Sequence, residues 1–230
     1  MLTPLHTDTT HTLPLATPQT KDLPKCVDLL HAAFYKDALT LAKQAFSPEE
    51  LERIEPPLRR VNGLLSRAAR ASLRAQANRR LGRRIRPDSP LAQTEPDERA
   101  SLMLCALAPS DGALDGVVEL SLEPRDGLVP GDLRLPLLVP RAPRVPYISN
   151  LAVREAARRQ GVGSELLLAA EAIARGWGYT EVYLHAASAK SSLRRFYTHR
   201  SYRELPEYDA PRWVLATSGR EPTTYMVRQL

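Results

Sequence analysis

One segment of the sequence constrains the fold more than any other, because a strand, a glycine loop and a helix follow one another in it without interruption. Residues 145–153 (VPYISNLAV) are mostly apolar or β-branched and predict a strand. Residues 161–177 begin with Gly-Val-Gly and continue with apolar side chains at helical spacing, which predicts a helix. A strand that enters a helix through such a loop is a backbone arrangement that binds phosphate groups.

The loop between this strand and this helix has the residues that a bound pyrophosphate requires. Free N–H groups at a helix N-terminus, together with the helix dipole, stabilise an anion. Gly161 and Gly163 allow the backbone to approach phosphate oxygens without a Cβ in the way, and Arg158 and Arg159 can add charge-assisted hydrogen bonds. A dinucleotide motif is not matched, because its third glycine position holds Leu166, and the Gly-Lys-Ser/Thr of a P-loop is absent. The structural alternative is a helix that simply begins with two glycines.

The rest of the chain predicts a mixture of strands and helices around this segment. Strands are expected at residues 12–16, 101–108, 116–122, 181–187, 202–205 and 225–228, and helices at residues 20–34 and 191–199. Leu23, Val27, Leu30 and Phe34 are expected to share one face of the first helix. Asp111-Gly112 suits a hairpin turn, and six prolines between Pro124 and Pro146 predict little regular structure there.

The positive charge of the chain is concentrated in one place. The formal charge is +6, but residues 59–86 contain ten Arg and no Asp or Glu, so the remainder sums to −4. Apolar residues recur every fourth position in this stretch, which predicts helical structure with a bend near Asn78 or Gly82, and Ser47-Pro-Glu-Glu predicts a helix start. We therefore expect one domain over residues 1–230, with a basic helical insertion at residues 47–90.

Composition excludes several classes of protein. Its 43% hydrophobic content is too high for a disordered chain. Cys26 and Cys105 are too few for a disulfide framework and lack metal-site spacing, so we expect no metal and a reducing compartment. No apolar run reaches the roughly 20 residues of a membrane span, and residues 1–10 resemble neither a signal peptide nor a transit peptide. A cytosol-like compartment is therefore the expected location.

Two motifs carry a resemblance to a known family. Arg158-Arg159-Gln160-Gly161-Val162-Gly163 matches the R/Q-x-x-G-x-G/A acetyl-CoA signature of the GNAT superfamily of N-acetyltransferases, and Leu151-Ala152-Val153 matches the strand before it. Residues 190–202 (KSSLRRFYTHRSY) match the family's later N-x-x-A-x-x-L-Y-x-x-x-G-F segment. The chain therefore resembles this superfamily over residues 145–204. The resemblance implies an α/β (α+β) GNAT fold, with a mixed, mostly antiparallel, splayed sheet flanked by helices, here with an Arg-rich helical insertion.

The resemblance also implies a site. Acetyl-CoA is the implied co-substrate, with its pantetheine arm along the backbone of Leu151 and Val153, its pyrophosphate on residues 158–164, and Tyr197 as general acid. The implied cofactor-binding residues are Leu151, Ala152, Val153, Arg158, Arg159, Gln160, Gly161, Val162, Gly163, Ser164, Lys190 and Ser191. Three positions differ from the family pattern: its common Asn, Ala and Gly are Lys190, Leu193 and Ser201 here. The hydrogen bond that the family's Asn usually makes is therefore not expected at Lys190, although Lys190 can still contact the cofactor.

No carboxylate is found on the expected central strand, so the general base is open. Glu119 on the preceding strand and His185 on the following strand are the candidates. A half-buried structural role for either residue, and proton transfer through ordered water, are the alternatives.

Three acceptors or partners are compatible with the sequence. The Arg-rich segment would repel a polyamine, so a protein or peptide amine, either a lysine or an N-terminal α-amine and perhaps in an acidic protein, is expected. The sequence also resembles the plastid and cyanobacterial branch of the superfamily, members of which acetylate proteins and in some cases arylalkylamines such as serotonin. This resemblance implies the prokaryotic cytosol or the plastid stroma as the location. The rival from another class is a GNAT-like binding module that docks on RNA, a ribosome or an anionic membrane through its arginines. No DNA partner is expected, and a solvated amphipathic helix explains the arginines equally well.

Overall fold

The computed structural model describes residues 14–18, 20–34, 47–50, 52, 55, 71, 101–130, 142–208 and 222–230. The chain divides into two compact units, each assembled from separate stretches of sequence. The first unit contains residues 1–87, 105–117 and 152–163, and the second contains residues 88–104, 118–151 and 164–230. The predicted polar loop at residues 88–100, and the Arg-rich stretch at residues 59–86 except Ala71, lie outside the described residues.

Seven strands form the sheet in the order β1-β2-β3-β4-β5-β7-β6. They are β1 Leu15–Ala16, β2 Ser101–Leu107, β3 Leu114–Pro124, β4 Arg144–Val153, β5 Glu181–Ala187, β6 Arg203–Glu204 and β7 Thr223–Gln229. The helices are η1 Thr20–Asp22, α1 Leu23–Phe34, η2 Glu155–Ala157, α4 Val162–Gly176, α5 Ser191–Thr198 and η3 Pro206–Tyr208. The β4–β5 pair is parallel, whereas the β1–β2, β5–β7 and β6–β7 pairs are antiparallel, so the predicted mixed sheet is confirmed.

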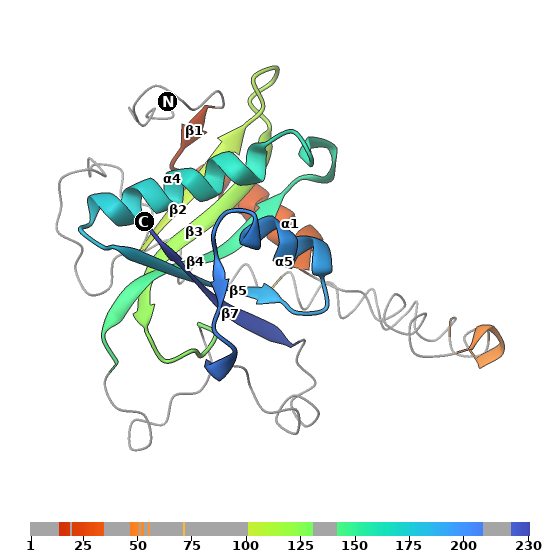
Figure 1. Ribbon diagram of the computed structural model, residues 1–230. Coiled ribbons are helices and arrows are strands. Elements are labelled where there is room, and N and C mark those ends of the chain that lie inside the picture. Colours follow the sequence, from red (N-terminus) through yellow and green to blue (C-terminus); the bar gives the residue numbers. More distant parts are fainter. Residues whose placement is uncertain are drawn as a thin grey trace. The chain divides into compact units, whose positions relative to one another are not determined.

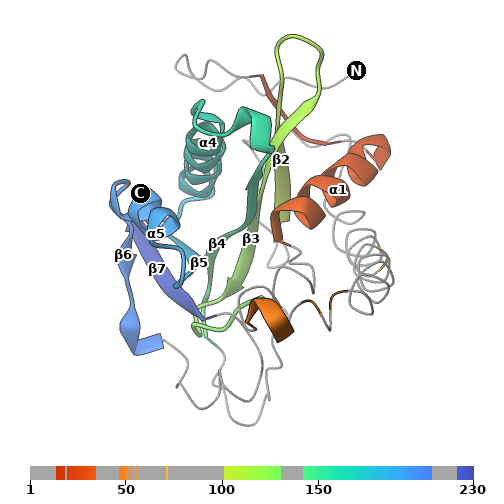
Figure 2. The same cartoon turned by 90° about the vertical axis from the view of Figure 1, so that its right-hand side faces the viewer.

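In the first unit, β1 lies at the edge of the sheet, where it begins the strand order. Leu15 pairs with Ala106 and Ala16 with Cys105, and the Cys105 thiol donates to the Ala16 carbonyl at 3.2 Å. Strand β1 is drawn in red and strand β2 in yellow-green in Figure 2. The turn between β2 and β3 is the predicted Asp111-Gly112 turn: Asp111 Oδ1 accepts from the backbone of Ala113 at 2.9 Å, and Gly112 has φ +66°.

Helix α1 confirms the predicted helix at residues 20–34 but not its whole apolar face. Leu23, Val27 and Leu30 are buried. Phe34 is 55% exposed, so the expectation that it shares the buried face is wrong. The helix ends at Phe34, and its inward stripe is completed by Cys26 and His31 instead.

In the second unit, the elements of residues 164–208 follow the predicted boundaries closely. Helix α4 buries Leu166, Leu167 and Ala170 completely. Strand β5 pairs with β7 along its whole length, from Glu181 opposite Gln229 to Ala187 opposite Thr223, and these two strands cross the centre of Figure 1. Helix α5 lies against β5. The predicted strand at 202–205 is reduced to the two residues of β6.

A buried ionic network ties α4 to the end of the second unit. The Glu171 carboxylate on α4 is 2% exposed. It accepts a hydrogen bond from the Tyr202 hydroxyl at 2.7 Å and another from Arg228 Nη1 at 2.5 Å. A buried charge needs such partners because removing it from water is costly. Glu171 is therefore a structural residue of this unit.

The sequence expectation of a helix start at Ser47 is also met. Ser47 Oγ accepts from the backbone of Glu50, and the Glu50 carboxylate accepts from the Ser47 backbone at 2.9 Å, which is a capping box at the predicted helix start. Among the helices that the structure describes, none has the length and hydropathy to span a bilayer.

Candidate active site

The loop from β4 to α4 adopts the strained conformation that its glycine suggested. Arg159 has φ +64° and Gly161 has φ +88°, both in the left-handed region that costs a side-chain-bearing residue about 1–2 kcal/mol. A Cβ on Gly161 would meet no protein atom within 4 Å, so within the chain itself the backbone angle is what favours glycine at this position. Arg158, Arg159, Gln160 and Gly161 are all exposed, and Val162 begins α4.

Side chains of the loop also fold back on its own backbone. Arg158 Nε donates to the Val153 carbonyl at 3.2 Å, and Gln160 Nε2 donates to the Ala156 carbonyl at 2.8 Å. Arg159, in contrast, makes no hydrogen bond or ion pair with another residue in the part of the chain that the structure describes. Of the two predicted phosphate ligands, Arg159 is therefore the available one, whereas Arg158 shapes the loop.

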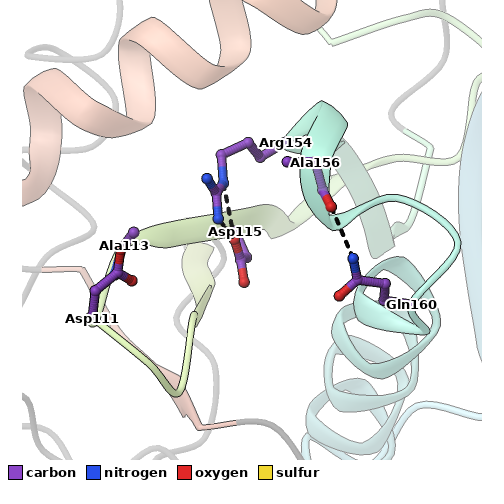
Figure 3. Close-up of polar contacts among 6 residues, drawn as sticks. All are labelled: Asp111, Ala113, Asp115, Arg154, Ala156 and Gln160. Atoms are coloured by element: carbon purple, nitrogen blue, oxygen red, sulfur yellow. Dashed lines mark hydrogen bonds and ion pairs between the residues drawn. The ribbon is translucent and has the colours of Figure 1, made fainter.

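A contact that the sequence did not suggest fixes the start of this loop. Arg154, the residue after β4, donates from Nε and Nη2 to Asp115 Oδ1 at 2.9 and 2.5 Å (Figure 3). Its backbone N–H also donates to the Asp115 carbonyl at 2.8 Å. The two residues are 39 positions apart, and no motif connects them. Both belong to the first unit.

In the second unit, β4 departs from β5 in the middle of the strand. The two strands pair at Tyr147 with Tyr183 and at Ile148 with Leu184, and no further β4–β5 pair is found in the described residues. Asn150, two residues on, has φ +53°, a bulge conformation that bends a strand. The splay implied by the family resemblance therefore has a local cause at Asn150, a residue type that tolerates the left-handed region.

Glu119, one of the two candidate bases, holds this bulge. It is 4% exposed on β3 and accepts a hydrogen bond from Asn150 Nδ2 at 2.6 Å. Leu151, the next residue on β4, is half-buried. The carboxylate and the bulged backbone are thus joined by a single side chain.

His185, the other candidate base, is held at both ring nitrogens. Its Nε2 lies 3.1 Å from the Gly127 carbonyl, and its Nδ1 lies 2.7 Å from the Tyr147 hydroxyl. Because a carbonyl only accepts, Nε2 carries a proton, and in the neutral ring Nδ1 accepts the Tyr147 hydroxyl proton. The ring also stacks on Tyr225 with centroids 4.7 Å apart. These contacts describe a structural histidine.

Tyr197 lies on α5 with its ring almost completely buried. The ring makes edge contacts with Phe196 and Tyr202, at centroid distances of 5.1 and 5.5 Å. Burial raises the pKa of Tyr197 to about 12, while the positive charge of Arg200 acts in the opposite direction. Its hydroxyl makes no hydrogen bond with any residue that the structure describes. It is therefore a protonated phenol available to another group.

The ends of α5 bear on the remaining predicted cofactor residues. Lys190 caps the helix through its backbone carbonyl, which accepts from Leu193 and Arg194, and both Lys190 and Ser191 are exposed. Ser164, in the first turn of α4, receives a short hydrogen bond from Arg200 Nη2. The Arg200 guanidinium also lies 3.9 Å from the centre of the Phe196 ring. Arg200 is not among the residues that the sequence motifs predict for the site.

The candidate site residues are divided between the two compact units. Val153 and residues 158–163 form the loop of the first unit, and Ala152, also assigned to that unit, is buried. Glu119, Leu151, Ser164, His185, Lys190, Ser191 and Tyr197 belong to the second. No cluster of three or more His, Cys, Asp or Glu side chains suited to a metal occurs among the described residues.

A mixed sheet, followed by an exposed, arginine-bearing loop that opens a helix, defines an α/β protein with a loop of the kind that binds phosphate groups. Residues 70–202 match the acetyltransferase (GNAT) family, and the chain belongs to this family. This confirms the predicted family and fold, and with them the enzyme class and acetyl-CoA as co-substrate.

Individual relatives agree with this assignment. The chain is 29% identical over 128 residues to the chloroplastic GCN5-related N-acetyltransferase 4 of Arabidopsis thaliana, a match that covers 51% of this chain and 43% of that protein. The chain thus spans less than half of that relative. A PaiA N-acetyltransferase of Thermoplasma acidophilum in complex with coenzyme A shares the fold, with a TM-score of 0.51 at 15% identity over 96% of this chain and 100% of that one. An acetyltransferase related to histone acetyltransferase HPA2 from Corynebacterium glutamicum gives 0.53 at 22% identity, over 95% and 97%.

Proposed function

We propose that this protein transfers the acetyl group of acetyl-CoA directly to an amine, most specifically to a lysine or an N-terminal α-amine of a protein. The observation that carries the proposal is the loop from Arg158 to Gly163. Within a chain of the acetyltransferase family, it combines exposed backbone, left-handed φ at Arg159 and Gly161, and the start of α4. These features suit the diphosphate of coenzyme A, whose charge the helix N-terminus and Arg159 would stabilise.

The acetyl group would be placed by the backbone of β4. An extended pantetheine arm needs a strand edge with N–H and C=O groups to spare, and the β4–β5 pairing stops before the bulge at Asn150. We assign Leu151 and Val153 to this contact. The Arg158 side chain already occupies the Val153 carbonyl, so at that residue the N–H is the group we assign to the arm.

The chemistry requires a neutral amine and an acid. The amine lone pair attacks the thioester carbonyl, a C–N bond forms, and the C–S bond breaks as the tetrahedral intermediate collapses. The departing sulfur takes a proton from the Tyr197 hydroxyl, which is protonated at neutral pH because burial raises its pKa to about 12. The tyrosinate regains a proton from solvent or from the product ammonium.

For the base we favour Glu119 over His185. His185 uses both ring nitrogens in contacts with Gly127 and Tyr147. Glu119 is a carboxylate attached to the bulge through Asn150. Because it is buried, we assign it to proton removal through an intervening water rather than by direct contact with the amine.

Two further assignments belong to this proposal. The chloroplastic relative supports the plastid stroma, and the prokaryotic cytosol is the other location. We also propose that residues 1–230 form one domain and that residues 47–90 are a basic insertion in it. Strands β2, β3 and β4 each contribute to both compact units, which supports one cooperative domain.

The test is acetylation of a whole proteome by the purified protein with isotope-labelled acetyl-CoA, read by mass spectrometry. Label on lysines or N-termini is expected, and Gly161→Trp should abolish both the label and acetyl-CoA binding in calorimetry. Serotonin, assayed in parallel, distinguishes an arylalkylamine acceptor. Acetyl-CoA binding by the wild type without transfer to any amine would refute the enzyme and favour a binding module.

A further inference from the structure

The contact between Asp115 and Arg154 is not explained by any family motif, although it adjoins the phosphate loop. Asp115 is the second residue of β3, and Arg154 is the residue between the end of β4 and η2. Three hydrogen bonds join them, two from the guanidinium to one carboxylate oxygen and one between the backbones. Both the main chain and the side chain of Arg154 are thereby fixed to one residue of the neighbouring strand, and Figure 3 shows the side-chain contact.

The ion pair is a modest contributor to global stability. The Arg154 side chain is 46% exposed and the Asp115 side chain 10%. Ion pairs with one well-exposed partner contribute on the order of 1 kcal/mol or less because water screens them. Its position, rather than its strength, is what distinguishes it from other ion pairs of the protein.

From Arg154 the contacts run on into the loop. The Arg154 carbonyl accepts from the backbone of Ala157 at 2.9 Å, and the Ala157 side chain is buried. Gln160 then donates to the Ala156 carbonyl, directly before Gly161. Asp115 is therefore the fixed point of a continuous series of contacts that ends where the helix begins.

The loop needs such an anchor because its conformation is unfavourable in isolation. Two of its residues, Arg159 and Gly161, have left-handed φ, and Arg159 bears a Cβ. If the loop adopted this conformation only on binding the donor, the free energy needed to order it would reduce the affinity. A loop that is already held in this conformation avoids that reduction.

We propose that Asp115 and Arg154 are positioning residues for the donor: their ion pair holds the loop in the conformation that binds the diphosphate of coenzyme A. This inference rests on the proposed function. Loss of the pair should raise the KM for acetyl-CoA about three- to fivefold, the most that an interaction on the order of 1 kcal/mol can cause, and change kcat at saturation less than twofold. The kcat/KM for a donor that lacks the diphosphate should not change when the ion pair is lost.

The experiment compares two donors in three variants. Asp115→Asn keeps the shape and removes the charge, and Arg154→Lys keeps the charge and removes the two-bond geometry. Glu204→Gln is the matched control, because it breaks the ion pair of Glu204 with Arg194, which is also held by two hydrogen bonds, of 2.7 and 2.8 Å, but anchors α5 to β6. The donors are acetyl-CoA and the acetyl thioester of pantetheine, which lacks the diphosphate.

The expected result for Asp115→Asn and Arg154→Lys is a higher KM for acetyl-CoA and an unchanged kcat/KM for acetyl-pantetheine. Glu204→Gln should show no change with either donor. Equal losses on both donors would mean general structural damage and would overturn the proposal. Calorimetry of coenzyme A gives a second reading: an unchanged Kd in Asp115→Asn, or in Arg154→Lys where the first variant does not fold, also overturns it. Failure of the wild type to bind coenzyme A would refute the proposed function instead.

Discussion

Tyr197 and Tyr202 provide a matched test of the general acid, because their rings touch but their hydroxyls differ. The Tyr197 hydroxyl makes no hydrogen bond within the described residues, whereas the Tyr202 hydroxyl donates to the buried Glu171 carboxylate at 2.7 Å. Both rings are at most 5% exposed. Replacing either residue by Phe keeps the ring packing and removes one oxygen.

The magnitudes follow from these environments. Tyr197→Phe removes no hydrogen bond to a described residue, so the free energy of unfolding should change by about 0.5 kcal/mol or less. Its kcat should fall about 100-fold or more, since a positioned acid typically contributes that much. Tyr202→Phe removes a hydrogen bond to a charged, buried group and should cost about 1.5–3 kcal/mol of stability. Its kcat should stay within about twofold of the wild type, on the order of the small changes expected where no proton-transfer group is lost.

The assay is steady-state kinetics with calorimetry of acetyl-CoA and chemical denaturation of each variant. Acetyl-CoA affinity should be unchanged in Tyr197→Phe, which separates acid catalysis from binding. Because the pKa of Tyr197 is raised to about 12, its ionisation should not reduce kcat below about pH 11. A Tyr197→Phe enzyme with more than half of the wild-type kcat, or equal kcat losses in the two variants, would refute the acid role.

Three other outcomes are expected. Gly161 and Gly178 have left-handed φ values of +88° and +84°, and both have open space for a Cβ. Gly161→Ala and Gly178→Ala should therefore each lower the free energy of unfolding by about 1–2 kcal/mol, but only Gly161→Ala should weaken acetyl-CoA binding in calorimetry. Burial raises the pKa of Tyr147, Tyr183, Tyr197, Tyr202 and Tyr225 above 10, so tyrosine ionisation should not change stability at neutral pH and should lower it above pH 10, by roughly 1.4 kcal/mol per pH unit for each tyrosine still protonated in the folded state. Tyrosinate absorbance should report one transition if the chain is one domain. Burial raises the pKa of Cys26 and Cys105 to about 12, so neither should react with a thiol reagent at pH 8 until the protein is denatured.

The parts of the fold that local sequence predicts are those whose causes are local. The strand at residues 145–153, the helix after Gly161 and the Asp111-Gly112 turn are each determined by side-chain period or by one backbone angle, and the structure has them within a residue or two. The prediction that Phe34 is buried is wrong because helical spacing extends the apolar stripe to the last residue of α1, where the side chain is exposed.

The contacts that complete the candidate site are of a different kind. Asp115 with Arg154 and Glu119 with Asn150 join residues 39 and 31 positions apart, across strands whose register no short motif encodes. In each pair, one member belongs to β4 or directly follows it, and the other comes from β3. Both pairs act on the backbone of the central strand, one at its bulge and one at its end. Family signatures mark the groups that would touch the cofactor. Asp115, in contrast, holds the backbone that presents them, so its substitution should alter donor binding without altering the signature itself.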